Sequence, residues 1–125
     1  MPEAERPIYH LALRYEWEAA VERNEPYRRS TLGKSLEDQG FIHCSFADQV
    51  AMIADLIYHG RRDVLLLVID PSRLQAEVRV ENVDGGEQLF PHIYGALPLE
   101  AVVRADRVPL GDDGRLAVGM LLASD

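Results

Sequence analysis

The stretch Val64-Leu65-Leu66-Leu67-Val68-Ile69-Asp70-Pro71 contains the longest unbroken apolar run of the chain, and the run ends at an aspartate and a proline. A membrane-spanning helix needs about 20 such residues, so this run is too short to cross a bilayer. An unbroken series of valines and leucines is typical of a strand that is buried on both faces. We therefore expect a central strand over residues 64–70, with the rest of the chain folded around it.

Outward from this strand, short apolar segments alternate with glycine- and proline-containing turns. Further strands are expected at residues 8–13, 41–44, 77–83, 90–94, 102–110 and 115–122, the last after a hairpin turn at Asp112-Asp113-Gly114. Helices are expected at residues 16–23, as one turn at 35–39, and after Ser45, which can cap a helix that Gly60 ends. Because the helices fall mainly in the N-terminal half, this order predicts an α+β fold rather than regular βαβ units.

Length and composition limit the possible classes of protein. The chain has 125 residues, of which 47% are hydrophobic, and this is typical of a single globular domain over residues 1–125. Its formal net charge of −8 argues against a protein that coats nucleic acid. The single cysteine, Cys44, excludes an intramolecular disulfide and a thiolate metal cage. The polar start lacks the pattern of a signal peptide, so we expect a cytoplasmic protein that does not bind membranes.

Three of the four histidines lie in expected strands, where successive side chains point to opposite faces. His43 then shares a face with Ser45, and His92 shares a face with Tyr94. A cleft between the strands would bring these four side chains together with His10. The alternative is that each histidine is a half-buried residue whose ring only bonds backbone. The fourth, His59, lies at a helix end, where the helix dipole favours a cation.

Other candidate chemistries depend on single residues. No His-x-His pair or His-Glu-x-x-His helix is present, so no metal is expected. Strand alternation turns Cys44 away from His43, which predicts a buried thiol rather than a nucleophile. Arg14, Arg28 and Arg29 could anchor phosphate groups, or could be solvated surface charges. Glu81 lies on the wet face of its strand, either as an active-site carboxylate or as an exposed residue.

The histidines and their neighbours also carry a family resemblance. The segments Ile8–Leu11, Gly40–Ser45 and Phe90–Gly95 resemble the bacterial family called domain of unknown function 952, over most of the chain from about Pro7 to Val108. That family has been grouped with the ADP-ribosyltransferase superfamily, whose members split NAD at the nicotinamide–ribose bond. The resemblance implies a split pair of antiparallel sheets around an NAD cleft. It implies a small-molecule nucleotide as the binding partner.

The resemblance also implies roles for individual residues. His10 would hold a ribose hydroxyl, and His43 with Ser45 would frame the nicotinamide half. His92 and Tyr94 occupy the late-strand segment in which the superfamily often carries a glutamate. The expected catalytic residues are thus His43, His92 and Tyr94, and the expected NAD contacts are His10, Ser45, Arg28 and Arg29. A non-catalytic nucleotide or small-molecule binding module and a histidine-dependent hydrolase stay open as alternatives, and the sequence does not indicate an oligomeric state.

Overall fold

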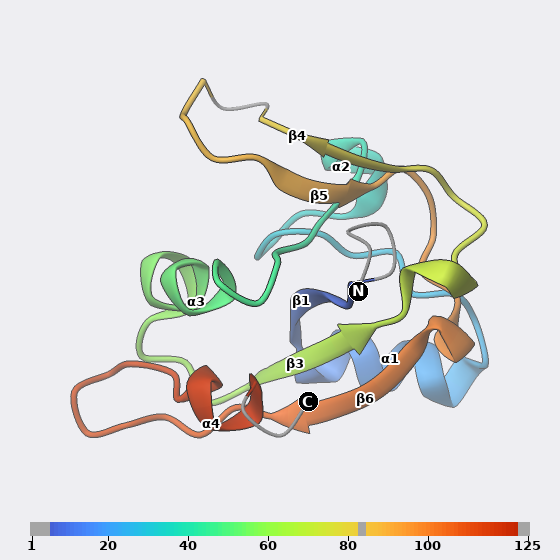
Figure 1. The fold of residues 1–125 in the computed structure, drawn as a ribbon. Coiled ribbons are helices and arrows are strands. Elements are labelled where there is room, and N and C mark those ends of the chain that lie inside the picture. The colour runs from blue at the N-terminus through green and yellow to red at the C-terminus, as the bar shows by residue number, and fades with distance from the viewer. Residues whose placement is uncertain (1–5, 83–84, 123–125) are drawn as a thin grey trace.

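The computed structural model describes residues 6–82 and 85–122. This part of the chain contains two three-stranded antiparallel sheets and four α-helices (Figure 1). The strands are β1 (Ile8–Leu13), β2 (Ile42–His43), β3 (Val64–Ile69), β4 (Val78–Glu81), β5 (Phe90–Ile93) and β6 (Val102–Arg107). The helices are α1 (Arg14–Arg23), α2 (Leu36–Gln39), α3 (Val50–Tyr58) and α4 (Val118–Leu122), with 3-10 turns η2 (Pro71–Arg73) and η3 (Leu99–Ala101).

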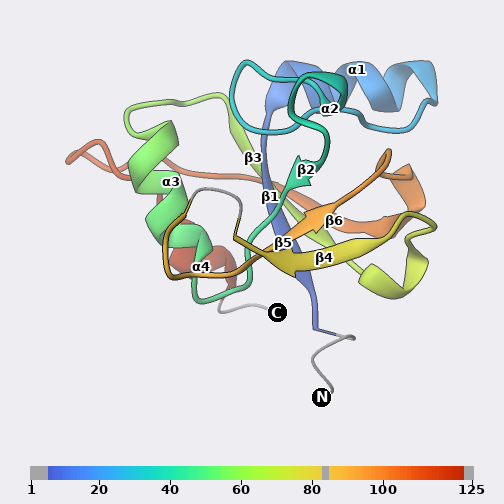
Figure 2. The same ribbon diagram turned by 90° about the horizontal axis from the view of Figure 1, so that it is seen from above.

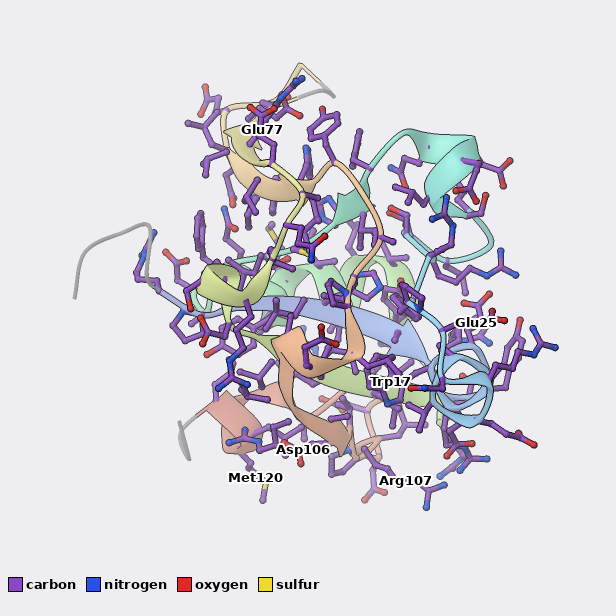
Figure 3. The ribbon with its side chains drawn as sticks, turned by 90° about the vertical axis from the view of Figure 1, so that its right-hand side faces the viewer. Trp17, Glu25, Glu77, Asp106, Arg107 and Met120 are labelled. Atoms are coloured by element: carbon purple, nitrogen blue, oxygen red, sulfur yellow. The ribbon has the colours of Figure 1, made fainter. Side chains whose placement is uncertain are left out.

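The first sheet has the order β1-β3-β6, so the apolar run of β3 is its central strand, as its sequence predicts. All six residues of β3 are buried. Leu65, Leu67 and Ile69 pack on one face in a core that includes Trp17, which Figure 3 shows between α1 and the sheet. The other face packs against α3 through Leu66 and neighbouring residues. Burial on both faces explains why the run contains no polar residue.

The second sheet has the order β2-β5-β4 and lies above the first in Figure 1. A short backbone bridge joins the two sheets, because Tyr9 and Ser45 exchange hydrogen bonds of 2.8 and 2.7 Å. Ser45 lies two residues beyond the end of β2, so the chain that leaves β2 is fixed against β1 at this bridge (Figure 2). The expected α+β fold with two antiparallel sheets is therefore confirmed.

Several sequence-based expectations are wrong in detail. Ser45 does not cap a helix, because its backbone pairs with Tyr9, and α3 begins only at Val50 after the N-cap residue Gln49. Alternation with Arg79 and Glu81 predicts that Val80 points into the core, but Val80 is 44% exposed because the core does not extend over the end of the short strand β4. Val83, the last valine that the expected strand at residues 77–83 would turn inward, lies outside the described residues.

The expected strand over residues 115–122 is also wrong. The hairpin turn does form, since Gly111 N–H donates to the Arg115 carbonyl at 2.8 Å, but the returning chain makes only the isolated bridge Leu110–Leu116. It then coils into α4, because Val118 and Leu122 pack into the core beside α3 at helical spacing. Within the described residues, no helix has the length and apolar content that crossing a membrane would require.

Candidate functional site

Two of the expected site histidines lie side by side on the second sheet. In the strand register, His43 of β2 is paired with His92 of β5, and His92 is paired with Arg79 of β4. His43 Nδ1 and His92 Nε2 are 3.3 Å apart, within hydrogen-bond distance. Because side chains of paired residues share a face, these three residues form one polar row across the sheet.

Glu81 extends this row from the end of β4. Its Oε1 lies 3.2 Å from His92 Nδ1 and also accepts a hydrogen bond from the Tyr94 hydroxyl. These two hydrogen bonds hold the pKa of the Glu81 carboxyl below its usual range. The His92 side chain is only 2% exposed, whereas the Glu81 side chain is 28% exposed. The carboxylate thus links a buried imidazole to the surface.

Phe41 covers the buried imidazole. Its ring stacks on that of His92, with the two centroids 4.1 Å apart and the planes inclined by 18°. The Tyr94 ring lies 5.5 Å from Phe41, and the Arg79 guanidinium carbon lies 4.3 Å from the centroid of Tyr94. This packing restricts the orientation of His92, so its two nitrogens are held toward Glu81 on one side and His43 on the other.

The hydrogen bonds of His92 to Glu81 and to His43 determine which ring nitrogens carry protons. A carboxylate can only accept, so His92 Nδ1 carries the proton that is donated to Glu81, and its Nε2 then accepts from His43 Nδ1–H. In that arrangement the second ring nitrogen of His43 carries a lone pair. A carboxylate–imidazole–imidazole chain of this kind can take up a proton at His43 and stabilise the resulting charge.

His10 lies beneath this chain rather than in it. Its Nδ1 donates to the His43 carbonyl at 2.7 Å, and its Nε2 accepts from the Tyr27 hydroxyl at 2.9 Å. Burial lowers the pKa of His10 to about 4, and burial raises the pKa of Tyr27 well above its ordinary value. The His10 ring is therefore neutral at pH 7, with both nitrogens bonded to protein groups that fix the backbone of β2.

A small cavity of about 10 Å³ lies where these groups meet. Its lining includes His10, His43, Ser45, Thr31 and Tyr58. The turn over residues 30–34 lies over it: Ser30 Oγ accepts from the His43 N–H at 3.0 Å, and the Leu32 N–H donates to the Tyr58 hydroxyl at 3.2 Å. A cavity of this size is at the lower limit for holding one water molecule.

The two arginines expected to contact NAD lie elsewhere. Arg28 pairs with Glu37, and Arg29 Nε lies 2.9 Å from Glu16 Oε2. Both arginines line a separate depression of about 440 Å³ beside α1. The structure thus brings together His10, His43, Ser45, His92 and Tyr94, and leaves Arg28 and Arg29 outside this group because acidic residues of α1 and α2 bind them.

Two other candidate residues are also placed. Arg14, the third arginine proposed for phosphate, lies 3.9 Å from Glu18 on the surface of α1. His59 follows the end of α3 and bonds Asp55 at 3.0 Å, away from the other histidines. In the described residues, no three histidine, cysteine, aspartate or glutamate side chains are arranged to hold a metal ion.

The sequence placed Glu81 on a wet face and left open whether it is an active-site carboxylate or an exposed residue. Glu81 lies 11 residues before His92 and pairs in register with Phe90, so its contact with His92 is diagonal across the two strands. A signal was present, because alternation puts Glu81 and Arg79 on one face of β4, and His92 and Tyr94 on one face of the next strand. Combining the two patterns requires knowing that β4 and β5 are neighbours.

Comparison with known proteins places the chain in a family. The model of the family described as "Protein of unknown function (DUF952)" matches residues 11–105. The crystal structure of protein CC0527 from Caulobacter crescentus is similar, with 29% identity, 94% of this chain and 98% of that chain covered, and a TM-score of 0.81. The solution NMR structure of CC0527 gives 30% identity, coverage of 95% and 98%, and a TM-score of 0.76. No curated protein matches the chain. The chain therefore belongs to the DUF952 family of proteins of unknown function.

Proposed function

We propose that the protein is an ADP-ribosyltransferase-like enzyme that binds NAD or a related nucleotide and transfers its ADP-ribosyl group. The observation that carries this proposal is the position of the Glu81 carboxylate beside His92 and Tyr94. The superfamily that the sequence resembles often carries a glutamate late in the fold, and the expected late segment lacks one. Glu81 supplies a carboxylate at that place from the neighbouring strand.

The chemistry of the reaction fits these groups. Cleavage of the glycosidic bond of NAD releases nicotinamide, leaves positive charge on the ribose, and forms a new bond from the ribose to the acceptor. A fixed carboxylate stabilises that developing charge, because it is already oriented when the charge appears. His43, with its lone pair, accepts the proton that the acceptor loses, and His92 and Glu81 stabilise the protonated imidazole.

The proposed site needs a conformational step. The cavity beside His43 is too small for a nucleotide, so the turn over residues 30–34 has to move before a nucleotide can enter. In this scheme His10 supports the backbone of His43 and does not contact the ribose, because both of its ring nitrogens are already bonded. Ser45 remains the residue beside the cavity that is available to frame the nicotinamide ring.

The test is calorimetric titration of NAD and ADP-ribose into the wild type, Glu81→Gln and Glu77→Gln, followed by a chromatographic assay for released nicotinamide. Glu77 is a matched control, because it lies just before β4 and its carboxylate bonds Arg79 at 3.2 Å rather than a histidine. We expect Glu81→Gln to lose nicotinamide release and Glu77→Gln to keep it. Absence of any binding at millimolar nucleotide, about 4 kcal/mol of binding free energy, would refute the NAD assignment.

The same experiment separates the binding-module alternative. If the wild type binds NAD but releases no nicotinamide, and Glu81→Gln binds as the wild type does, the protein is a non-catalytic nucleotide-binding module. In that case the carboxylate–histidine chain has a structural role. His43→Asn then leaves the affinity for NAD unchanged as well.

A histidine-dependent hydrolase is the second candidate. The direction of the hydrogen bonds from His43 through His92 to Glu81 favours it. The lone pair on His43 is suited to taking a proton from water, and the adjacent cavity is at the lower limit for one water molecule. Its test is hydrolysis of p-nitrophenyl acetate and bis-p-nitrophenyl phosphate by the wild type and His43→Asn. Hydrolysis that His43→Asn abolishes, without any NAD binding, would support this candidate over ADP-ribosyl transfer.

A further inference from the structure

The turn over residues 30–34 closes the cavity beside His43 through single hydrogen bonds between uncharged groups. Ser30 Oγ accepts from the His43 N–H at 3.0 Å, and the Leu32 N–H donates to the Tyr58 hydroxyl at 3.2 Å. A hydrogen bond of this kind contributes little net free energy, because water takes the place of the lost partner when the two groups separate. These contacts therefore allow the turn to lift from the cavity while the surrounding fold stays intact.

The turn is held together internally, and its tip is not packed against the rest of the protein. The Ser30 N–H donates to the Lys34 carbonyl at 3.0 Å, and the Lys34 N–H donates to the Thr31 carbonyl at 2.8 Å. Gly33 at the tip is exposed, and apart from its chain neighbours a Cβ built on it would meet no heavy atom of the described residues within 4 Å. Residues 30–34 can thus move as one unit about their two ends.

Arg29 and Ser35 form the base of this turn, where an isolated backbone bridge joins them. The Arg29 guanidinium Nε lies 2.9 Å from Glu16 Oε2 of α1, so an ion pair attaches the base to that helix. The Glu16 side chain is only 10% exposed, whereas that of Arg29 is 43% exposed. Burial raises the pKa of the Glu16 carboxyl, and the charge of Arg29 opposes that shift. The carboxylate has lost most of its contact with water and depends on Arg29 for compensation.

A second ion pair at the same base has a different environment. The chain between α1 and α2, which includes the turn, runs beside both helices in Figure 2. Arg28 pairs with Glu37 of α2, but both side chains are exposed. Water and salt screen an exposed pair of this kind, so it contributes little to stability. Of the two arginines that precede the turn, Arg29 is therefore the one whose ion pair can hold it in place.

We propose that residues 30–34 are a lid over the histidine cavity and that the ion pair between Arg29 and Glu16 is the latch that holds the lid closed. Because Ser30 follows Arg29 directly, opening breaks the latch together with the hydrogen bond between Ser30 and His43. Glu16 is thus a positioning residue, which acts on the site through the lid. The lid serves any ligand of the cavity, so its opening is measured without ligand, and failure of the nucleotide proposal leaves it standing.

Hydrogen–deuterium exchange of single backbone amides, followed by NMR on the full chain, measures the opening. The His43 N–H is protected by Ser30 and exchanges when the lid opens, whereas the Leu66 N–H in the central strand β3 exchanges when the whole protein unfolds. We expect the protection factor of His43, which is its slowing relative to an unstructured peptide, to be at least about tenfold below that of Leu66. Glu16→Gln should lower the His43 protection factor by a further factor of about ten, because the latch is lost.

Two controls separate the lid from a general loss of stability. Glu37→Gln removes the exposed ion pair of Arg28 and should leave the His43 protection factor within about twofold of the wild type. Ile69→Val creates a small defect in the buried core of β3, so it should speed the exchange of Leu66 and leave that of His43 unchanged. Equal acceleration of both amides by Ile69→Val would show that His43 exchanges only by unfolding, and would refute the lid.

Variants of Arg29 test whether the ion pair acts as a unit. Arg29→Gln should lower the His43 protection factor at least as much as Glu16→Gln, since it leaves a buried carboxylate without its cation. Arg29→Lys keeps the charge and should retain more protection than Arg29→Gln. The double variant should open no further than Arg29→Gln alone, because both substitutions remove the same contact. Equal protection of His43 and Leu66 in the wild type, equal effects of Glu16→Gln and Glu37→Gln, or additive effects of Glu16→Gln and Arg29→Gln would overturn the proposal.

Discussion

Glu81 and His92 are hydrogen-bonded at 3.2 Å although the strand register does not place them opposite each other. Glu81 is opposite Phe90, and His92 is opposite Arg79. Diagonal neighbours of this kind are within reach only of longer side chains, and glutamate is long enough to span the offset. The diagonal also leaves the carboxylate partly exposed while the imidazole is buried, and this permits exchange of protons between solvent and the site.

The hydroxyl of Tyr94 is the largest cause of the low pKa of Glu81. Tyr94→Phe removes that donor and should raise the Glu81 pKa toward its ordinary value, because the ionised carboxylate loses a hydrogen bond. Carboxyl ¹³C NMR chemical shifts followed through a pH titration measure this change. Tyr15→Phe is the control, since Tyr15 is 63% exposed on α1, whereas the side chains that hydrogen-bond Glu81 are those of His92 and Tyr94. An unchanged Glu81 titration in Tyr94→Phe would show that the hydroxyl does not act on the carboxylate.

The buried hydrogen bond between Tyr27 and His10 should make a measurable contribution to stability. Tyr27 is 1% exposed, and Tyr27→Phe leaves His10 Nε2 without its 2.9 Å donor inside the core. An unsatisfied buried group costs about 1–3 kcal/mol, so the free energy of unfolding should fall by that amount in urea titrations. The exposed substitution Tyr15→Phe should change it by less than about 0.5 kcal/mol. Equal effects of the two substitutions would contradict the predicted role of the Tyr27 hydroxyl.

His10 should make the protein less stable in mild acid. Burial lowers its pKa from 6.5 to about 4 in the folded chain, so the unfolded chain takes up a proton at a higher pH than the folded chain. Stability that is present above pH 6.5 is therefore lost as the pH falls toward 4, by about 3 kcal/mol for this residue. Urea titrations of the wild type and His10→Gln between pH 7 and pH 4 measure the difference. The variant should show a shallower decline, and parallel declines would assign the acid sensitivity to other residues.

Cys44 should be unreactive in the folded protein. It is 1% exposed, its thiol lies 3.7 Å from the Ile42 carbonyl, and burial raises its pKa, so little reactive thiolate forms. The aromatic disulfide 5,5′-dithiobis(2-nitrobenzoate) should label the chain only as fast as it unfolds, and addition of urea should accelerate the reaction. The chain has one cysteine, so the signal reports this site alone. Rapid labelling without denaturant at neutral pH would contradict the prediction.

Local patterns in the sequence predicted the elements whose environment is uniform along their length. The unbroken apolar run identified β3 as the central strand, and the strand expected at 8–13 has the bounds of β1. The strand expected at 115–122 failed because an apolar segment such as Leu121-Leu122 satisfies a helix and a strand equally, and its contact with α3 decides between them. The expected helix-capping role of Ser45 is wrong for a similar reason, since the backbone of Ser45 pairs with that of Tyr9 instead.

The candidate site was predictable only in its parts. Alternation within each strand placed His43 with Ser45 and His92 with Tyr94, and the structure brings these pairs together with His10. The contribution of Glu81 depends on which strands are neighbours, and a single strand pattern does not contain that information. The pairing of Arg28 and Arg29 with carboxylates of α1 and α2 depends likewise on tertiary contacts.

The backbone bridge between Tyr9 and Ser45 affects the order in which parts of the structure form during folding. The histidine site next to this bridge is built from residues far apart in the sequence. His10 contacts the backbone of His43, 33 positions away, and His43 contacts the side chain of His92, 49 positions away. Closing such long loops costs entropy that local helices and hairpins do not pay, so long-range contacts tend to form late. A refolding chain should regain its helical circular dichroism before the imidazole resonances of His43 and His92 reach their native shifts. Intermediates on this pathway would then be compact but lack the assembled histidine site.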